Sequence, residues 1–336
     1  MDIVEAPPKR RKIPHWLVPT LGYLVSGASL VWVFWRFPWA QLGDHLRTLE
    51  WNWVALAIIF EVSVYFADAW RWRALLKPVG APSFGLCLQS VFVGMLANDI
   101  LPAKAGELVR CFLLSYESEV PLSLAITSDV ILRVMDGLWI VILYLAVTLQ
   151  IGTHMVIRDV MWCFGIGAVV VAGLVLFVLF RRQHAHHFVR TRSWGARFVD
   201  LLDEIHRLGR WPELRNGMVI SSAYWLAQIL AIWALTKADR FDLGLSAAAF
   251  LLVVKAVWTL LPNAPANVGA YQAAVVYAFV FLFVERPNAQ AFAEIMFAFL
   301  TLPIAVGGAI AVLFADVDLF TLHRRARENE HQRSGF

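Results

Sequence analysis

The segment 98–110 places acidic and basic side chains inside an otherwise apolar stretch of the chain. A charge at the centre of a bilayer costs at least ~2.5–3.5 kcal/mol, so ionisable residues there usually face a protein interior or a wet cavity. Lys104, Glu107 and Arg110 follow one another at three-residue steps, and on a helix they would share a face and could pair. Together with Asn98, they are candidates for binding a polar group within the membrane.

A second charged set lies in the apolar segment 121–150. Asp129, Arg133 and Asp136 are spaced by four and three residues, which predicts an acid–base–acid ladder along one helix face. A paired set is cheaper to bury than any single charge. One interpretation is that Arg133 faces a central cavity, where its planar guanidinium could hold a lipid phosphate while the two aspartates fix it. The alternative is a structural ion network between packed helices.

Glu61, Tyr65 and Asp68 of the apolar segment 51–70 share one helix face with Trp72, two residues after it. The two acids are natural partners for the basic residues at 104, 110 and 133. As the alternative, Asp68 is an interfacial residue that pairs with Arg71 or Arg73, which follow the span on its cytoplasmic side.

Two apolar segments are interrupted in the same way, and this is a weak internal repeat. Pro102 and Pro262 each end a short apolar segment and are followed within a few residues by a glycine, Gly106 or Gly269. Proline breaks a helix and glycine permits close backbone approach, so both places predict a turn at membrane depth. Paired interruptions in two halves of a chain point to a transporter site. The plainer alternative is that both residue types are common in membrane helices.

Polar residues around the second turn complete the candidate site. Lys255 lies too far from either end of its apolar segment to reach water easily. Asn267 and Gln272 belong to the turn and the helix after it, and Pro265 is a further turn residue.

The 336-residue chain is 60% hydrophobic and 16% charged, which excludes a disordered protein and predicts an all-α polytopic membrane protein. Its three cysteines show no C-x-x-C spacing, so neither disulfides nor a zinc site are suggested. The histidines at 184, 186 and 187 lie among arginines that would repel a cation. No phosphate-binding loop or hydrolase motif occurs, so we expect no metal, no cofactor, no nucleic-acid partner and no enzymatic activity.

The arrangement of apolar runs and basic flanks predicts a single membrane domain, 16–315, between basic tails at 1–15 and 316–336. The positive-inside rule places both tails, and therefore both termini, in the cytoplasm. An arginine-rich loop at 181–217 lies on the same side and joins two halves, 16–180 and 218–315.

Segment lengths divide this domain into crossing and non-crossing parts. Short segments at 83–115 and 245–284 predict two re-entrant hairpins that enter from opposite sides, as an inverted repeat requires. A short loop is expected at 38–50. Six full spans are expected, at 16–35, 51–70, 121–150, 159–180, 218–236 and 290–314.

The first charged segment and Arg133-x-x-Asp136 resemble the first signature of the flippase-like membrane family typified by the transmembrane domain of lysylphosphatidylglycerol synthase. The second signature of that family, Pro-Gly-Gly-x-Gly-x-x-Glu, is similar to residues 265–272 here, where Gln272 stands in place of the frequent glutamate. The resemblance runs over about 15–315. The positions that carry its first part are Asn98, Leu101, Pro102, Gly106, Glu107 and Arg110.

The resemblance implies a lipid-translocating fold in which two opposed hairpins meet near the midplane. It does not imply aminoacylation of a lipid, because the 336 residues hold no soluble aminoacyl-transferase domain. Some stand-alone members of the family accompany hopanoid or glycolipid biosynthesis.

The leading hypothesis is therefore a transporter that moves a lipid between the leaflets of a bacterial inner membrane. Anionic phospholipids, hopanoids and polyprenyl-linked lipids are the candidate substrates. The alternative is an accessory or transferase-type protein that binds a lipid and presents it to a lipid-biosynthesis enzyme, and a homodimer is compatible with both. A small-solute channel is disfavoured because no selectivity ring is recognisable.

Overall fold

Four long helices form the frame of the molecule. A computed structural model describes residues 39–101, 105–151, 208, 211–259 and 265–314, and all regular structure within them is helical. The long helices are α3 (Trp51–Leu76), α6 (Leu122–Ile151), α10 (Trp211–Ala238) and α13 (Arg286–Leu313). All four are long and apolar enough to cross a membrane. The predicted class, an all-α membrane protein, is confirmed.

Four of the six predicted spans correspond to these helices. The other two, at 16–35 and 159–180, lie outside the described residues, as do both tails and most of the loop 181–217.

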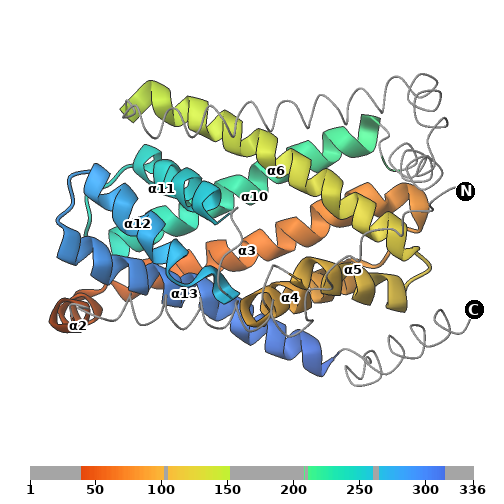
Figure 1. Ribbon diagram of the computed structural model, residues 1–336, viewed down its shortest axis with the longest axis horizontal. Helices are drawn as coiled ribbons and strands as arrows, with labels where there is room; N and C mark the ends of the chain where they lie inside the picture. Colours follow the sequence, from red (N-terminus) through yellow and green to blue (C-terminus); the bar gives the residue numbers. More distant parts are fainter. Residues whose placement is uncertain (1–38, 102–104, 152–207, 209–210, 260–264, 315–336) are drawn as a thin grey trace, which may run out of the picture.

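Four shorter helices form two antiparallel pairs. They are α4 (Phe84–Ile100), α5 (Gly106–Glu117), α11 (Leu245–Trp258) and α12 (Ala270–Phe281). At ~1.5 Å per residue they measure roughly 18–26 Å, which is less than a ~30 Å hydrocarbon core. Helix α4 packs against α5, α11 packs against α12, and the two pairs occupy opposite ends of the bundle (Figure 1). Helix α4 also contacts the short turn η3 (Pro265–Asn267), so the interrupted segments of the two halves meet.

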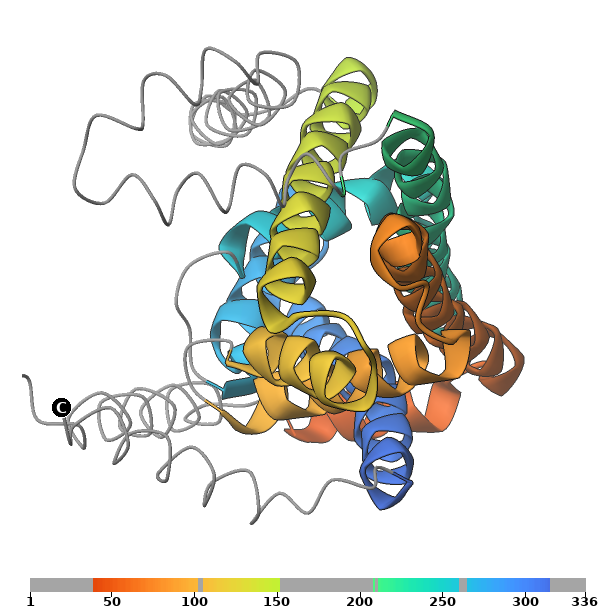
Figure 2. The same ribbon diagram turned by 90° about the vertical axis from the view of Figure 1, so that its right-hand side faces the viewer.

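Helices α3 and α10 lie side by side over their length, in the side view and in the end view (Figures 1 and 2). At one end the Glu50 N–H donates to the Ala238 carbonyl at 2.9 Å. At the other end a Cβ on Gly217 would lie only 3.3–3.5 Å from Met135 and Leu75, so the small residue permits close packing. Lipid tails are as apolar as leucine, so close packing and polar contacts, rather than hydrophobic burial, hold such helices together.

Two buried apolar clusters correspond to the two short pairs. One is built mainly on α10, α11, α12 and α13, and includes Phe279 stacked on Phe292 with ring centroids 4.5 Å apart. The other joins α3, α4, α5 and α6 around Trp72, Leu114 and Leu132. Each short pair is therefore held by its own set of long helices.

Three helix boundaries differ from the sequence-based prediction by four residues or more. Helix α10 already includes Trp211, seven residues before the predicted start at 218. Helix α13 begins at Arg286 rather than 290, with a proline in its first turn. Helix α3 continues to Leu76 rather than 70, and this carries Arg71 and Arg73 into the helix.

The region predicted as a loop at 38–50 contains a helix, α2 (Trp39–Thr48). It is too short and polar to be a span, but packing against α13 gives it the support that an isolated ten-residue helix lacks. His45 Nδ1 also lies 2.7 Å from Asp239 Oδ2, in the turn after α10. Burial raises the pKa of Asp239, and the hydrogen bond with His45 opposes that rise.

Candidate functional site

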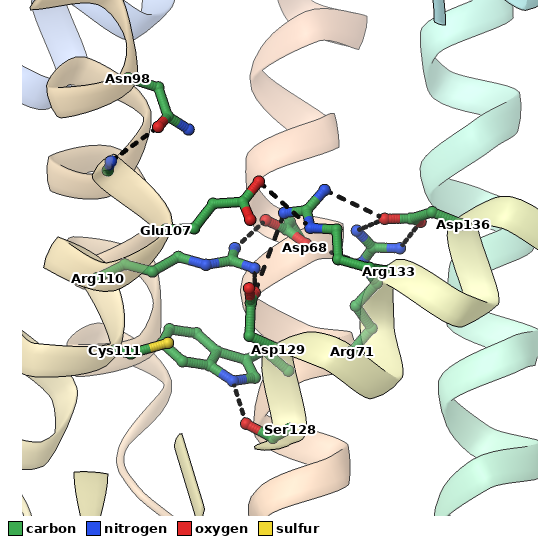
Figure 3. Close-up of polar contacts among 12 residues, drawn as sticks. Asp68, Arg71, Asn98, Glu107, Arg110, Cys111, Ser128, Asp129, Arg133 and Asp136 are labelled. Carbon is green, nitrogen blue, oxygen red and sulfur yellow. Dashed lines mark hydrogen bonds and ion pairs between the residues drawn. The ribbon is translucent and has the colours of Figure 1, made fainter. Parts of the chain in front are cut away.

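Arg71 is a fully buried arginine that connects three long helices. It extends from α3, and its Nε donates to Asp68 Oδ1 at 2.7 Å, one turn earlier (Figure 3). Its Nη1 and Nη2 both reach Asp136 on α6, the second at 3.2 Å. The guanidinium carbon lies 4.0 Å from the centroid of the Tyr224 ring on α10. The sequence-based placement of Arg71 beyond the membrane span is therefore wrong, because α3 continues past it and turns it towards α6 and α10.

Arg110 is the second buried arginine, with a side chain only 1% exposed. It points from α5 towards α3 and α6, where Nη1 donates to Asp68 Oδ2 at 3.1 Å and Nη2 pairs with Asp129 Oδ1. The guanidinium carbon lies 4.9 Å from the centroid of the Trp72 ring. The indole N–H of Trp72 in turn donates to Ser128 Oγ at 2.8 Å.

Arg133 is the accessible arginine of this group. Its side chain is 39% exposed, and that of its partner Glu107 is 30% exposed. Its contacts are longer than those of the two buried arginines: 3.4 Å to Glu107, 3.5 Å to Asp136 and 4.0 Å to Asp129. The predicted charged face of α6 is thus present, but its aspartates pair more closely with Arg71 and Arg110 than with Arg133.

We call this group the arginine cluster, and its members are Asp68, Arg71, Glu107, Arg110, Asp129, Arg133 and Asp136. Three arginines face four carboxylates, which leaves a formal charge of −1 if all are ionised. Buried pairs are costly to break, so Arg71 and Arg110 are held in place. Arg133 and Glu107 form the edge of the cluster at which a polar ligand could exchange for a protein partner.

Gly106 brings α5 into close contact with α4. A Cβ at this position would overlap the Gly94 carbonyl oxygen and would lie 2.6 Å from the Asn98 nitrogen. The Gly106 N–H donates to Asn98 Oδ1 at 2.8 Å, which ties the start of α5 to the end of α4 (Figure 3). Asn98 therefore positions the turn from which Glu107 and Arg110 extend.

The second interruption has a similar contact between a side-chain amide and a glycine. The Gly269 N–H donates to Gln272 Oε1 at 2.8 Å, at the start of α12. Gly269 has φ = 86°, which favours glycine, and Ala266 and Asn267 also have positive φ, at 54°. In both interruptions a side-chain amide oxygen accepts from the N–H of a glycine that begins the next helix. This likeness extends the weak repeat seen in the sequence.

Gln272 also donates from Nε2 to Glu294 Oε2 of α13, at 3.4 Å. We expect Gln272→Glu to place two carboxylates in contact, where like charges repel unless one holds a proton. The variant should be about 1–3 kcal/mol less stable than the natural protein at pH 8, and less impaired at pH 5. Unfolding of the protein in detergent at the two pH values measures this.

The exchange variant Gln272→Glu with Glu294→Gln is the matched control. It restores one amide donor and one carboxylate acceptor, so its stability should depend on pH as that of the natural protein does. Equal destabilisation of Gln272→Glu at pH 5 and pH 8 would contradict the assigned contact.

Lys255 belongs to a different polar group. It lies on α11, with Nζ 5.8 Å from the centroid of the Tyr271 ring, and it interacts electrostatically with Glu61 of α3. The Tyr65 hydroxyl donates to Glu61 Oε1 at 2.8 Å. On the predicted polar face of α3, Glu61 and Tyr65 thus belong to the group around Lys255, and Asp68 belongs to the arginine cluster.

The structure brings together five of the predicted site residues: Glu107, Arg110, Asp129, Arg133 and Asp136. Asn98, Gln272 and Lys255 lie outside the cluster, and Asn267 lies in the turn η3. Pro102, Lys104 and Pro262 are outside the described residues. Sequence reasoning named Asp68 as a partner for Arg110 or for Arg71, and both pairings are present, but it left Asp68 and Arg71 off the list of site residues. The three-residue spacing of Asp68 and Arg71 could have indicated an ion pair on one helix face. The sequence did not show that the pair lies within the span, because that depends on α3 continuing to Leu76.

Comparison with known proteins supports a membrane lipid-related function. A family model described as "Lysylphosphatidylglycerol synthase TM region" matches residues 20–314. A "UPF0104 membrane protein" of Methanothermobacter thermautotrophicus is 32% identical over 102 residues, and the match covers 29% of this chain and 29% of that relative. No solved structure matches the chain.

Proposed function

Because the chain belongs to the lysylphosphatidylglycerol synthase transmembrane-region family, we propose that it moves a lipid or a lipid-linked headgroup between the leaflets of a bacterial inner membrane. One observation carries the proposal. The arginine cluster lies among apolar helices and has an accessible edge at Arg133 and Glu107. Candidate substrates are anionic phospholipids, hopanoids and polyprenyl-linked lipids.

The geometry supports a specific exchange at this edge. A planar guanidinium can bind a phosphate through two parallel hydrogen bonds. A headgroup phosphate would replace Glu107, whose contact with Arg133 is 3.4 Å, while Arg71 and Arg110 keep their closer partners. The cluster already has one more carboxylate than it has arginines, so a bound phosphate would leave Glu107 without a basic partner. Glu107 would then turn to water or take up a proton. No aminoacyl transfer is part of this proposal.

We further propose that α4–α5 and α11–α12 are re-entrant hairpins related by an inverted repeat. Their short lengths, their positions at opposite ends of the bundle, and the contact between α4 and η3 support this. The paired amide–glycine contacts at Asn98 and Gln272 support it too. With the spans expected at 16–35 and 159–180, both termini would lie in the cytoplasm.

Replacing Arg133 with alanine should slow lipid movement by about tenfold or more, since it removes a charged hydrogen-bonding partner of the headgroup. The measurement uses liposomes that contain the purified protein and a fluorescent lipid, with quencher added outside to follow exchange between leaflets. Arg133→Lys, which keeps the charge but not the two-bond geometry, should retain part of the rate. Arg240→Ala removes an exposed arginine that lies in the turn after α10 and outside the arginine cluster, so it should leave the rate unchanged.

Equal rates in the natural protein and in Arg133→Ala would reject this mechanism. A protein that binds labelled lipid but never moves it would instead favour the accessory or transferase-type alternative. In that case we expect the cytoplasmic loop 181–217 to be needed for copurification of a lipid-biosynthesis enzyme.

A further inference from the structure

A pocket of about 420 Å³ is lined by residues at the end of α3 and the start of α10. These two helix ends lie at the right of Figure 1. The volume of the pocket is within the range of small-molecule sites in proteins. The lining includes Trp70, Arg73, Lys77, Asn216, Val219 and Ile220, and none of its residues in the described part of the chain is acidic. The pocket is on the outer face of α3, whereas Asp68, Arg71 and Trp72 point inwards.

The two cations of this pocket are available to a ligand. Arg73 and Lys77 are exposed, and within the described part of the chain neither makes an ion pair. Arg73 Nε donates to the Pro82 carbonyl at 3.0 Å, which steadies the guanidinium beside the pocket. Arg71, by contrast, is buried and pairs with the carboxylates of Asp68 and Asp136. Among the residues that the structure describes, nothing neutralises the positive charge that Arg73 and Lys77 bring to the pocket.

The apolar part of the lining indicates where the ligand comes from. Trp70 is 60% exposed and Val219 is 64% exposed, on adjacent faces of two helices that are long enough to span a membrane. Tryptophan and basic side chains at a span end are typical of the headgroup level of a bilayer. A soluble anion would gain nothing from Trp70, Val219 and Ile220, whereas a lipid could place its chains along them.

We propose that this pocket binds the phosphate of an anionic phospholipid through Arg73 and Lys77, with the acyl chains lying against Val219 and Ile220 on α10. The bound lipid would bridge α3 and α10 from outside. Such a ligand stabilises the fold increasingly as its concentration rises above its dissociation constant, because it binds only the folded protein. This site does not depend on lipid movement through the arginine cluster, and it remains testable if that activity is absent.

The test measures the shift in unfolding temperature of the full-length protein in zwitterionic detergent as dioleoylphosphatidylglycerol is added. Each variant is compared with its own lipid-free value. We expect Arg73→Gln with Lys77→Gln to weaken the apparent affinity by about tenfold or more, since each basic residue near an anionic lipid contributes to binding. Asn216→Glu, which adds a negative charge to the intact pocket, should also weaken it.

The matched control is Lys237→Gln with Arg240→Gln, which removes the same charge from the opposite end of the bundle and should leave the affinity unchanged. Dioleoylphosphatidylcholine and inorganic phosphate at the same concentrations should give much smaller shifts in the natural protein. The proposal is overturned if the Arg73 and Lys77 double variant binds phosphatidylglycerol as tightly as the natural protein. It is also overturned if either comparison compound reproduces the full shift.

Discussion

Replacing Arg71 with methionine should lower the free energy of unfolding by about 3–5 kcal/mol, the usual cost of removing one partner from a buried ion pair. Methionine keeps much of the length of the side chain, so the loss of stability comes mainly from removal of the positive charge. Asp136 would retain Arg133 at 3.5 Å as its partner, and the Tyr224 ring would lose the guanidinium 4.0 Å from its centroid. Unfolding in mixed detergent micelles, followed by circular dichroism, measures the change.

Two further variants separate pairing from packing in this prediction. Arg240→Met removes an exposed arginine whose Nε is 3.2 Å from Glu50, and an exposed pair contributes only ~0–1 kcal/mol. Arg71→Met combined with Asp136→Leu removes a cation and an anion together and should recover part of the lost stability. If Arg71→Met were no more harmful than Arg240→Met, Arg71 would not be the buried centre that the structure describes.

Gly106→Ala should be the most disruptive single-methyl change in the described residues. The added Cβ would overlap the Gly94 carbonyl oxygen, which is backbone and cannot rotate away, so α4 and α5 must separate. Overpacking usually costs ~1–3 kcal/mol, and a backbone overlap of this kind should cost about 3 kcal/mol or more. The separation would also move Arg110 away from Asp68 and Asp129, so lipid movement should be lost with stability.

Gly85→Ala is the control for this change, since Gly85 lies on α4, the helix that Gly106 of α5 contacts, but a Cβ there meets nothing within 4 Å. Alanine is the better helix former, so this variant should be neutral or more stable by up to ~1 kcal/mol. Comparison of the two variants in the same unfolding assay isolates the helix–helix contact. Similar stability of both would show that α4 and α5 are not packed as closely as described.

The amino-acid sequence by itself determined the membrane class, the four long helices, and the short helices on either side of the two interruptions with their glycines. It also determined that Asp129, Arg133 and Asp136 share a helix face, because the 3.6-residue period makes that a local property. Spacing likewise put Glu107 and Arg110 on one helix, α5. These predictions needed only apolar length, proline and glycine positions, and residue spacing.

Only the tertiary structure decided which faces meet. Asp68 and Arg110 are 42 residues apart and Arg71 and Asp136 are 65 apart, so helical spacing does not fix these pairs. The sequence left the partner of Asp68 open among several basic residues, and it did not suggest the pair of Arg71 and Asp136. The packing of α3, α5 and α6 places Arg71 and Arg110 in the interior and leaves Arg133 at the accessible edge. The amide oxygens of Asn98 and Gln272 accept from glycine N–H groups, because the start of a helix leaves backbone donors that need acceptors. That these two side chains also bind a substrate stays a prediction.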